Sequence, residues 1–206
     1  MSPQPSAPSA ITLYLRRLKN GDASAEEDLA DAVYERLVHM AKSAMHGRSA
    51  ADSLQPTALA NEVLLELVRI RDIDWHDRIH FYRVASRLLR RRLIDHIRVT
   101  KAEKRPQPGH RVPLNDLLLP KVERFDEIYE VHCALEQLAD FDPDLAELIE
   151  MVYFGGFTIT ALAELRGVSE KTIDRHLELG RRWLKKKLGP ACPELGDSIA
   201  FSFDRR

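Results

Sequence analysis

The sequence has few cysteines and no long apolar segment. Its two cysteines, Cys133 and Cys192, are too few for a disulfide scaffold, and neither belongs to a C-x-x-C pair. No apolar run approaches the roughly 20 residues of a membrane-spanning helix. The first residues, MSPQPSAPSA, lack the charged and apolar regions of a signal peptide. We therefore expect a soluble cytoplasmic protein.

The sequence also lacks the motifs of common enzymes. It contains no glycine-rich phosphate-binding loop and no nucleophile motif. His76 and His80 are four residues apart, but the glutamate of an H-E-x-x-H motif is missing and no third ligand is evident. We therefore predict no enzymatic activity, no metal site and no cofactor.

Charge is distributed unevenly, although the net charge is only −1. Residues 78–105, the basic block, contain ten lysines and arginines and two acids. Residues 115–150, the acidic block, contain two lysines and arginines and eleven acids. Residues 169–188 are basic again, with seven cations and three acids. Two basic segments predict two nucleic-acid-facing surfaces, and the acidic block between them has the charge needed to cover the basic block.

Apolar residues recur at three- and four-residue intervals, which predicts an all-α fold. Helices are expected over residues 11–19, from an N-cap at Ser24, from Pro56, from about Ile79, from Phe125 and from Pro143. We predict two small helical domains, 10–98 and 125–188, joined by a proline-containing linker, 99–124, with a disordered tail at 1–9 and a C-terminal tail at 189–206. Cys133 lies on an apolar stripe and is expected to be a buried thiol.

Residues 158–188 have the pattern of a helix-turn-helix. Gly167 tolerates the left-handed backbone needed between two helices, and Ala163 is small where the helices would cross. Ser169 is a suitable N-cap for the second helix, and Ile173 would anchor that helix in the core. This order of residues is typical of corners that read DNA, and the run RRWLKKK at the end of the second helix offers cations for phosphates. The run alone would equally fit a solvated helix end.

Aromatic and arginine residues alternate around the start of the helix that follows the 70–78 loop. Flat rings and cations in that arrangement suit single-stranded DNA. The structural alternative is that the rings attach the loop to the core. We expect Phe81 to be core and Trp75 or Tyr82 to be exposed. The arginines expected on the outside are Arg83, Arg87, Arg90, Arg91 and Arg98.

Three segments, in this order, resemble a bacterial sigma factor of the extracytoplasmic-function (ECF) group in the sigma-70 family: LQPTALANEVLLELV, DRIHFYRVASRLLRRRLIDHIR and YFGGFTITALAELRGVSEKTIDRH. The resemblance spans residues 11–188. It implies a protein that binds core RNA polymerase, recruits it to promoters and assists opening of the DNA.

The resemblance also implies roles for individual residues. Polymerase binding, on the β′ clamp helices, falls to Asn61, Glu62, Leu65 and Arg69, and the β flap is a further expected contact. Capture of the unpaired minus-ten element falls to Trp75, Arg78, His80 and Tyr82, with Arg87, Arg91 and Arg98 on the backbone. Duplex reading of the minus-thirty-five element falls to Lys171, Thr172, Arg175 and His176, with Arg181 and Arg182 on phosphates.

One segment departs from the family pattern. The family commonly has acids just before the polymerase-binding position, where this chain has LQPTAL at residues 54–59. One hypothesis is that a Ser/Thr kinase supplies the missing charge on Thr57, or alternatively on Ser53. The alternative is that Thr57 merely helps the helix to start. Control by an anti-sigma factor is neither supported nor excluded by the sequence.

Two other functions remain open at this point. The first is a conventional helix-turn-helix regulator, in which only the C-terminal corner touches DNA and the N-terminal half senses a signal or dimerises. The second is a helical adaptor without a DNA role. The arginine-rich helix at 83–98 argues against a dimer face, and the adaptor would require both basic segments to serve only solvation.

Overall fold

The computed structural model describes residues 10–45, 54–70, 73, 75, 77–103 and 121–188. Within these residues all regular secondary structure is helical, which confirms the all-α prediction. The helices are α1 (Ala10–Lys19), α2 (Ser24–Ala44), α3 (Pro56–Arg69), α4 (Arg78–Glu103), α5 (Lys121–Phe141), α6 (Pro143–Tyr153), α7 (Ile159–Arg166) and α8 (Glu170–Leu188). The tails expected at 1–9 and 189–206 lie outside the described residues.

The N-terminal half, α1–α4, is built around the apolar stripe of α2. Leu29, Val33, Leu37 and Met40 follow at helical intervals and are all fully buried, as the sequence predicts. The N-cap of α2 is Ala23, so the prediction that Ser24 caps this helix is wrong. Ser24 lies in the first turn, and its backbone N–H and hydroxyl instead donate to the carboxylate of Asp22, at 3.0 and 2.7 Å.

Helix α3 begins at Pro56, where a missing backbone N–H costs no helical hydrogen bond. Two pairs attach it to α4. Arg92 donates to Glu66 at 2.8 and 2.6 Å, and a ring nitrogen of His96 lies 3.0 Å from the carboxylate of Glu62. These contacts fix the orientation of α3, and therefore of its outer face, relative to α4.

The C-terminal half, α5–α8, begins earlier than predicted. Helix α4 continues to Glu103 and α5 starts at Lys121, so both ends of the predicted 99–124 linker are helical, while residues 104–120 lie outside the described part of the chain. The α6 N-terminus is as predicted, because Asp142 accepts a hydrogen bond from the Leu145 N–H at 3.0 Å. Cys133 is only half-buried, contrary to the buried thiol that we predicted.

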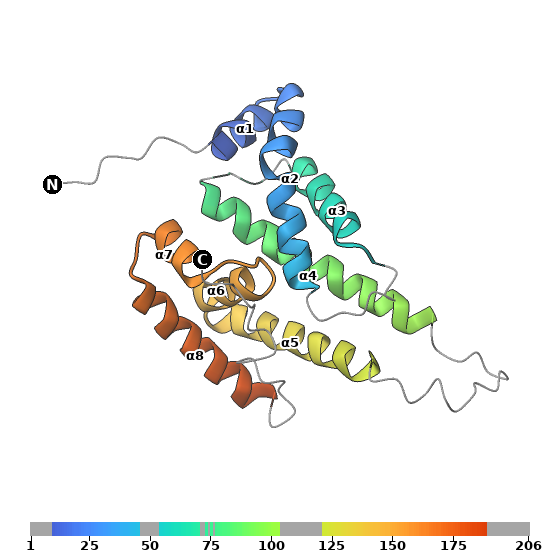
Figure 1. The fold of residues 1–206 in the computed structure, drawn as a ribbon, viewed down its shortest axis with the longest axis vertical. Helices are drawn as coiled ribbons and strands as arrows, with labels where there is room; N and C mark the ends of the chain where they lie inside the picture. Colours follow the sequence, from blue (N-terminus) through green and yellow to red (C-terminus); the bar gives the residue numbers. More distant parts are fainter. Residues whose placement is uncertain are drawn as a thin grey trace, which may run out of the picture.

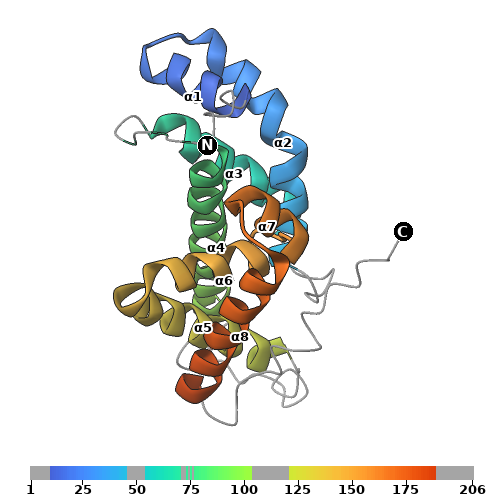
Figure 2. The ribbon, with the colours of Figure 1, turned by 90° about the vertical axis from the view of Figure 1, so that its left-hand side faces the viewer.

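The two halves pack against each other along α4. This helix contacts α2 and α3 on the N-terminal side and α5 and α6 on the C-terminal side (Figures 1 and 2). Helix α8 packs on α6 and α5, and its Gly180 is buried where a Cβ atom would lie 2.4 Å from Cδ1 of Ile149. Buried side chains of both halves belong to one contiguous cluster.

Among the described helices, none combines the length and apolar character required to cross a membrane.

Candidate nucleic-acid interface

Helices α7 and α8 form the two-helix corner that the sequence predicts. Gly167 adopts a left-handed conformation, with φ 65° and ψ 34°, and the Val168 N–H donates to the Ala163 carbonyl at 3.0 Å. Ser169 caps α8, because its hydroxyl accepts a hydrogen bond from the Thr172 N–H at 3.1 Å. Ala163 and Ile173 are buried between the helices. Local residues therefore set the angle between α7 and α8.

The outer side of α8 is open to solvent. Lys171, Arg175 and His176 are exposed, and Thr172 is half-buried with its hydroxyl 2.8 Å from that of Ser169. Lys171 and Arg175, and likewise Thr172 and His176, are four residues apart, so each pair lies on one side of the helix. The structure thus gathers the four residues that the resemblance assigns to duplex DNA.

The two arginines predicted to contact phosphates differ in their surroundings. Arg182 is exposed, whereas Arg181 is half-buried and donates to the Tyr153 hydroxyl at 2.9 Å. Farther along α8, Lys185, Lys186 and Lys187 are exposed. Arg182 and the three lysines therefore provide most of the accessible charge at this end of the helix.

The aromatic residues near the start of α4 are buried. Phe81 is fully buried, as predicted, but Trp75 and Tyr82 are only 6% and 8% exposed, so the expectation that one of them is exposed is wrong. Trp75 packs on Phe81, with ring centroids 5.8 Å apart, within the N-terminal half. Tyr82 meets the edge of Phe157, from the loop after α6, at 5.3 Å. Burial raises the pKa of the Tyr82 hydroxyl above its ordinary value.

Arg90 also differs from its predicted position. It was expected on the outside of α4, but only 2% of its surface is exposed. Its guanidinium donates to Glu150 at 2.7 Å and to Glu136 at 2.6 Å, and it contacts Nδ1 of His132. The correction has a simple physical cause, because α5 and α6 pack on the side of α4 that would otherwise face water.

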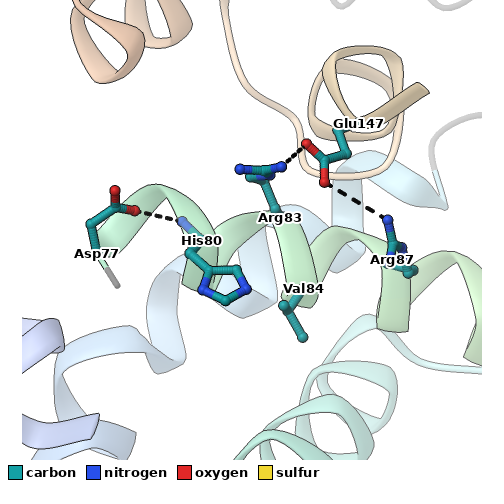
Figure 3. A pocket seen from close by; sticks show the side chains of 6 residues that line it. All are labelled: Asp77, His80, Arg83, Val84, Arg87 and Glu147. Carbon is teal, nitrogen blue, oxygen red and sulfur yellow. Dashed lines mark hydrogen bonds and ion pairs between the residues drawn. The ribbon is translucent and has the colours of Figure 1, made fainter. Parts of the chain in front are cut away.

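Two neighbours of Arg90 on α4 also meet the acidic block. Arg83 forms an ion pair with Glu147, and Arg87 lies 3.9 Å from Glu147 and 3.7 Å from Glu150. Arg83, Arg87 and Glu147 line a cavity of about 310 Å³ between α4 and α6, together with Asp77, His80 and Val84. Figure 3 shows these six side chains. The sequence alone left open whether the acidic block covers the basic block, and the structure shows such a contact at these arginines.

The remaining predicted cations of α4 stay accessible. Arg78, Arg91 and Arg98 are exposed. The Arg98 guanidinium lies 5.3 Å from the ring centre of Tyr129 and 3.5 Å from the carboxylate of Asp95. His80 is half-buried beside Trp75, with ring centroids 5.5 Å apart, and its backbone N–H donates to Asp77 at 2.8 Å.

Burial shifts the pKa values of two groups that surround Arg90. Burial raises the pKa of the Glu150 carboxyl, and the charges of Arg90 and Arg87 oppose that rise. Burial, and then the charge of Arg90, lowers the pKa of His132 below its ordinary value. A neutral His132 can accept a hydrogen bond from Arg90, whereas a protonated ring would be repelled by it.

Sequence reasoning missed the residues of the C-terminal half that contact α4. Glu136, Glu147, Glu150 and Phe157 were not singled out individually. The charge of the acidic block was the available signal for the three glutamates. No local pattern pointed to Phe157, because its partner Tyr82 is 75 positions earlier in the chain.

The outer side of α3 is accessible. Asn61 and Arg69 are exposed, and Leu65 is 50% exposed although it is apolar. Glu62, the fourth predicted polymerase contact, is half-buried against His96. Thr57 is exposed in the first turn of the same helix.

Comparison with the sequence models of protein families identifies the family to which this chain belongs. The model of the ECF sigma factor family matches residues 8–189, which include both helical halves. Comparison with curated proteins gave no match. The family match covers most of the 206 residues and contains α3, α4 and the α7–α8 corner. The chain therefore belongs to the ECF sigma factor family, whose members are transcription initiation factors that direct RNA polymerase to promoters.

Proposed function

We propose that this sigma factor binds core polymerase through α3, captures the unpaired minus-ten strand near the start of α4, and reads the minus-thirty-five element with α8. The observation that carries the proposal is the α7–α8 corner. Its left-handed Gly167 and its Ser169 cap present a helix with an accessible cationic side. Within the family, such a corner is a helix-turn-helix that enters the major groove.

The residues on α8 suit the edges of base pairs. Lys171 and Arg175 can donate to guanine or to phosphates, and Thr172 can donate or accept. Because all three lie in the first two turns, they belong to the part of a reading helix that contacts bases. Arg182, farther along the helix, is available for the backbone.

The residues on α3 suit a protein partner. Leu65 is apolar and half-exposed between the polar side chains Asn61 and Arg69. Burial of a fully exposed leucine is worth about 1.5–3 kcal/mol, and about half of the Leu65 surface remains to be buried by a partner. The ties of Glu62 and Glu66 to α4 hold this face in place before the partner arrives. Core polymerase, through the β′ clamp helices, is the partner that we assign to it, with the β flap as a second contact for the C-terminal half.

The start of α4 suits a single strand once both Trp75 and Tyr82 become accessible. Trp75 and Tyr82 supply rings for stacking, His80 supplies a polar edge, and Arg78 supplies an exposed cation. Stacking of a base on an aromatic ring is worth about 1–3 kcal/mol, which offsets part of the cost of unstacking DNA. Arg87, Arg91 and Arg98 would hold the strand's phosphates.

Phosphorylation of Thr57 is proposed as the activating signal. No acid lies in the first turn of α3, and the side chain of its N-cap residue, Gln55, makes no capping hydrogen bond. A phosphate there would place nearly two negative charges against unpaired N–H groups. The exposed threonine is accessible to a Ser/Thr kinase, and the added charge would replace the acids that other family members have at this position. Ser53, the other site considered, lies outside the described residues.

Polymerase binding tests the α3 assignment. Purified protein is titrated into core polymerase as wild type, Leu65→Ala, and Leu13→Ala, in which a similarly exposed leucine on α1 is removed. We expect at least tenfold weaker binding for Leu65→Ala and an unchanged affinity for Leu13→Ala. Equal affinities for all three proteins would reject α3 as the polymerase-binding face.

Two substitutions at Thr57 separate phosphorylation from helix initiation. Thr57→Glu is expected to tighten polymerase binding, and Thr57→Ala to abolish transcription in cells without lowering helicity. Transcription at the wild-type level from Thr57→Ala would reject the phosphorylation hypothesis while leaving the sigma assignment intact.

Promoter reading is tested with reconstituted holoenzyme on fragmented host DNA. Arg175→Ala should change or abolish the set of initiated transcripts, whereas Arg16→Ala, an exposed arginine on α1, should not. A conventional regulator would instead bind symmetric duplex sites without polymerase. We place transcription initiation by this protein in the cytoplasm, where polymerase and chromosomal DNA are found.

A further inference from the structure

We propose that the C-terminal half of the free protein acts as a cover over the single-strand-binding side of α4, and that the polymerase-binding and duplex-reading faces stay outside this cover. The proposal rests on the proposed function for what α4 binds. The covering contact itself rests on the ion pairs and aromatic contacts between the halves. We call Arg83, Arg87 and Arg90 the arginine row.

The arginine row is paired with carboxylates of α5 and α6. Arg83 and Arg87 meet Glu147, which is only 13% exposed, and Figure 3 shows both guanidinium groups directed at its carboxylate. A carboxylate and a phosphate oxygen offer the same kind of acceptor to a guanidinium. Glu147 therefore occupies the place that a DNA phosphate would take, and the two cannot be bound at once.

Arg90 makes a nearly fully buried attachment between the halves. Its side chain is 2% exposed and lies between Glu150, 4% exposed, and Glu136. A buried arginine is stable only when its charge and its N–H groups are paired. Arg90 is thus the residue whose pairing depends most on the closed arrangement.

The loop after α6 extends the cover to Tyr82. Phe157 packs edge-on against Tyr82 and lies beneath the guanidinium of Arg36 on α2, 4.2 Å from the ring centre. Arg36 also donates to the carbonyls of Gly155 and Gly156, at 3.3 and 3.4 Å. The burial of Tyr82 is therefore partly a result of the closed arrangement.

The two glycines allow this close approach. A Cβ atom at Gly155 would lie 2.5 Å from the hydroxyl oxygen of Ser86 on α4. One at Gly156 would lie 2.3 Å from the hydroxyl oxygen of Ser43 on α2. The loop backbone therefore fits against the N-terminal half at distances that a side chain would prevent.

The cover is selective. Leu65 on α3 and Lys171 and Arg175 on α8 remain exposed in the closed protein. Core polymerase can therefore bind α3 before the halves separate, whereas Tyr82 and Arg90 are buried and Arg83 and Arg87 are already paired with Glu147. Binding of polymerase would precede capture of the unpaired strand, and free sigma factor would not occupy single-stranded DNA on its own.

Small-angle scattering of the full chain tests the cover independently of DNA. Glu147→Gln/Glu150→Gln removes the charges that face the arginine row. Glu164→Gln/Glu178→Gln removes two exposed acids of the same half and gives the same net charge. We expect a larger radius of gyration for the first protein only. Circular dichroism is the control that shows whether both variants keep the wild-type helicity.

Arg36→Ala is a second variant, and it removes no apolar side chain of the buried cluster. It removes the contacts of Arg36 with Phe157 and with the two carbonyls, and Arg16→Ala is its control. We expect Arg36→Ala to enlarge the radius of gyration in the same direction. Unchanged scattering for both Arg36→Ala and the glutamine pair at 147 and 150 would overturn the proposal.

A DNA-binding assay tests whether the covered side of α4 is a single-strand-binding surface. The probe is a fluorescein-labelled 12-nucleotide single strand, and its binding is followed by fluorescence anisotropy. The Glu147→Gln/Glu150→Gln protein should bind at least tenfold more tightly than the Glu164→Gln/Glu178→Gln protein. Opening in scattering without this gain would also overturn the proposal, because the separated surface would then not be a single-strand site. Failure of the proposed function is recognised separately, by wild-type protein that does not bind core polymerase.

Discussion

The guanidinium of Arg90 on α4 donates to the carboxylate of Glu150 on α6 at 2.7 Å, and both side chains are almost fully buried. The two residues are 60 positions apart and belong to different halves of the molecule. Their pairing connects the packing of the halves to the accessibility of the basic block. It also yields a prediction about stability that does not depend on what the protein binds.

Removal of either partner should be strongly destabilising. Arg90→Ala leaves the Glu150 carboxylate buried, with Arg87 at 3.7 Å as its remaining cation. Loss of one member of a buried pair costs about 3–5 kcal/mol of the free energy of unfolding. Urea denaturation should show this loss, whereas Arg91→Ala, at an exposed position on the same helix, should stay within about 0.5 kcal/mol.

A double-mutant cycle shows whether the pair acts as a unit. Arg90→Ala/Glu150→Ala should lose clearly less stability than the sum of the two single losses, because neither charge is left unpaired. Additive losses would contradict a direct interaction between the two side chains.

Gly180 should not tolerate alanine. A Cβ atom would lie 2.4 Å from Cδ1 of Ile149, and overpacking of this kind costs about 1–3 kcal/mol, against about 1 kcal/mol gained in helix propensity. We expect Gly180→Ala to lower the thermal midpoint. The same substitution in an Ile149→Val background, which lacks Cδ1, should be less harmful or stabilising, and equal effects in both backgrounds would contradict this contact.

Gly167 should be replaceable at a modest cost that comes from the backbone alone. Its φ of 65° is unfavourable for residues with a Cβ atom, but among the described residues nothing beyond its own chain neighbours lies within 4 Å of the position of that Cβ. Gly167→Ala should therefore cost about 1–2 kcal/mol of the free energy of unfolding. Gly167→Asn should cost less, since asparagine adopts the left-handed conformation more readily. Equal losses would indicate a cause other than φ.

Acidification should weaken the contact between the halves through His132. The groups that act on its pKa are Arg90, Arg91 and Arg98 of α4, which lower it, and Glu136 of α5, which raises it; burial is the largest cause of the net lowering. The pKa of His132 in the folded protein lies below its ordinary value, so the neutral ring favours the folded state. This contribution of His132 to the free energy of unfolding is complete above about pH 6.5 and is lost as the pH falls toward the pKa in the folded protein.

The stability of wild type and of His132→Gln can be compared from pH 8 to pH 5.5. We expect the free energy of unfolding of wild type to decrease more steeply below about pH 6.5 than that of His132→Gln. Glutamine retains an acceptor for Arg90 but does not titrate. Parallel curves for the two proteins would exclude His132 as the titrating group.

Local sequence was sufficient for much of the fold. The α2 stripe, the Pro56 start of α3, the Asp142 cap and the α7–α8 corner all follow from residues within a few positions of one another. These features depend on helical periodicity, caps and the backbone preference of glycine, which act within a single helix or turn. The family assignment rests on the same local segments.

The tertiary structure decided the environments of Trp75, Tyr82 and Arg90. Helical periodicity indicates which side of a helix a residue lies on, but it does not tell whether another element covers that side. Arg90 and Tyr82 are buried because Glu150 and Phe157, at least 60 positions later, pack on them. The amino-acid sequence therefore specified the helices and the α7–α8 corner, whereas the long-range packing of α5 and α6 on α4 determined which of the predicted DNA contacts are accessible in the free protein.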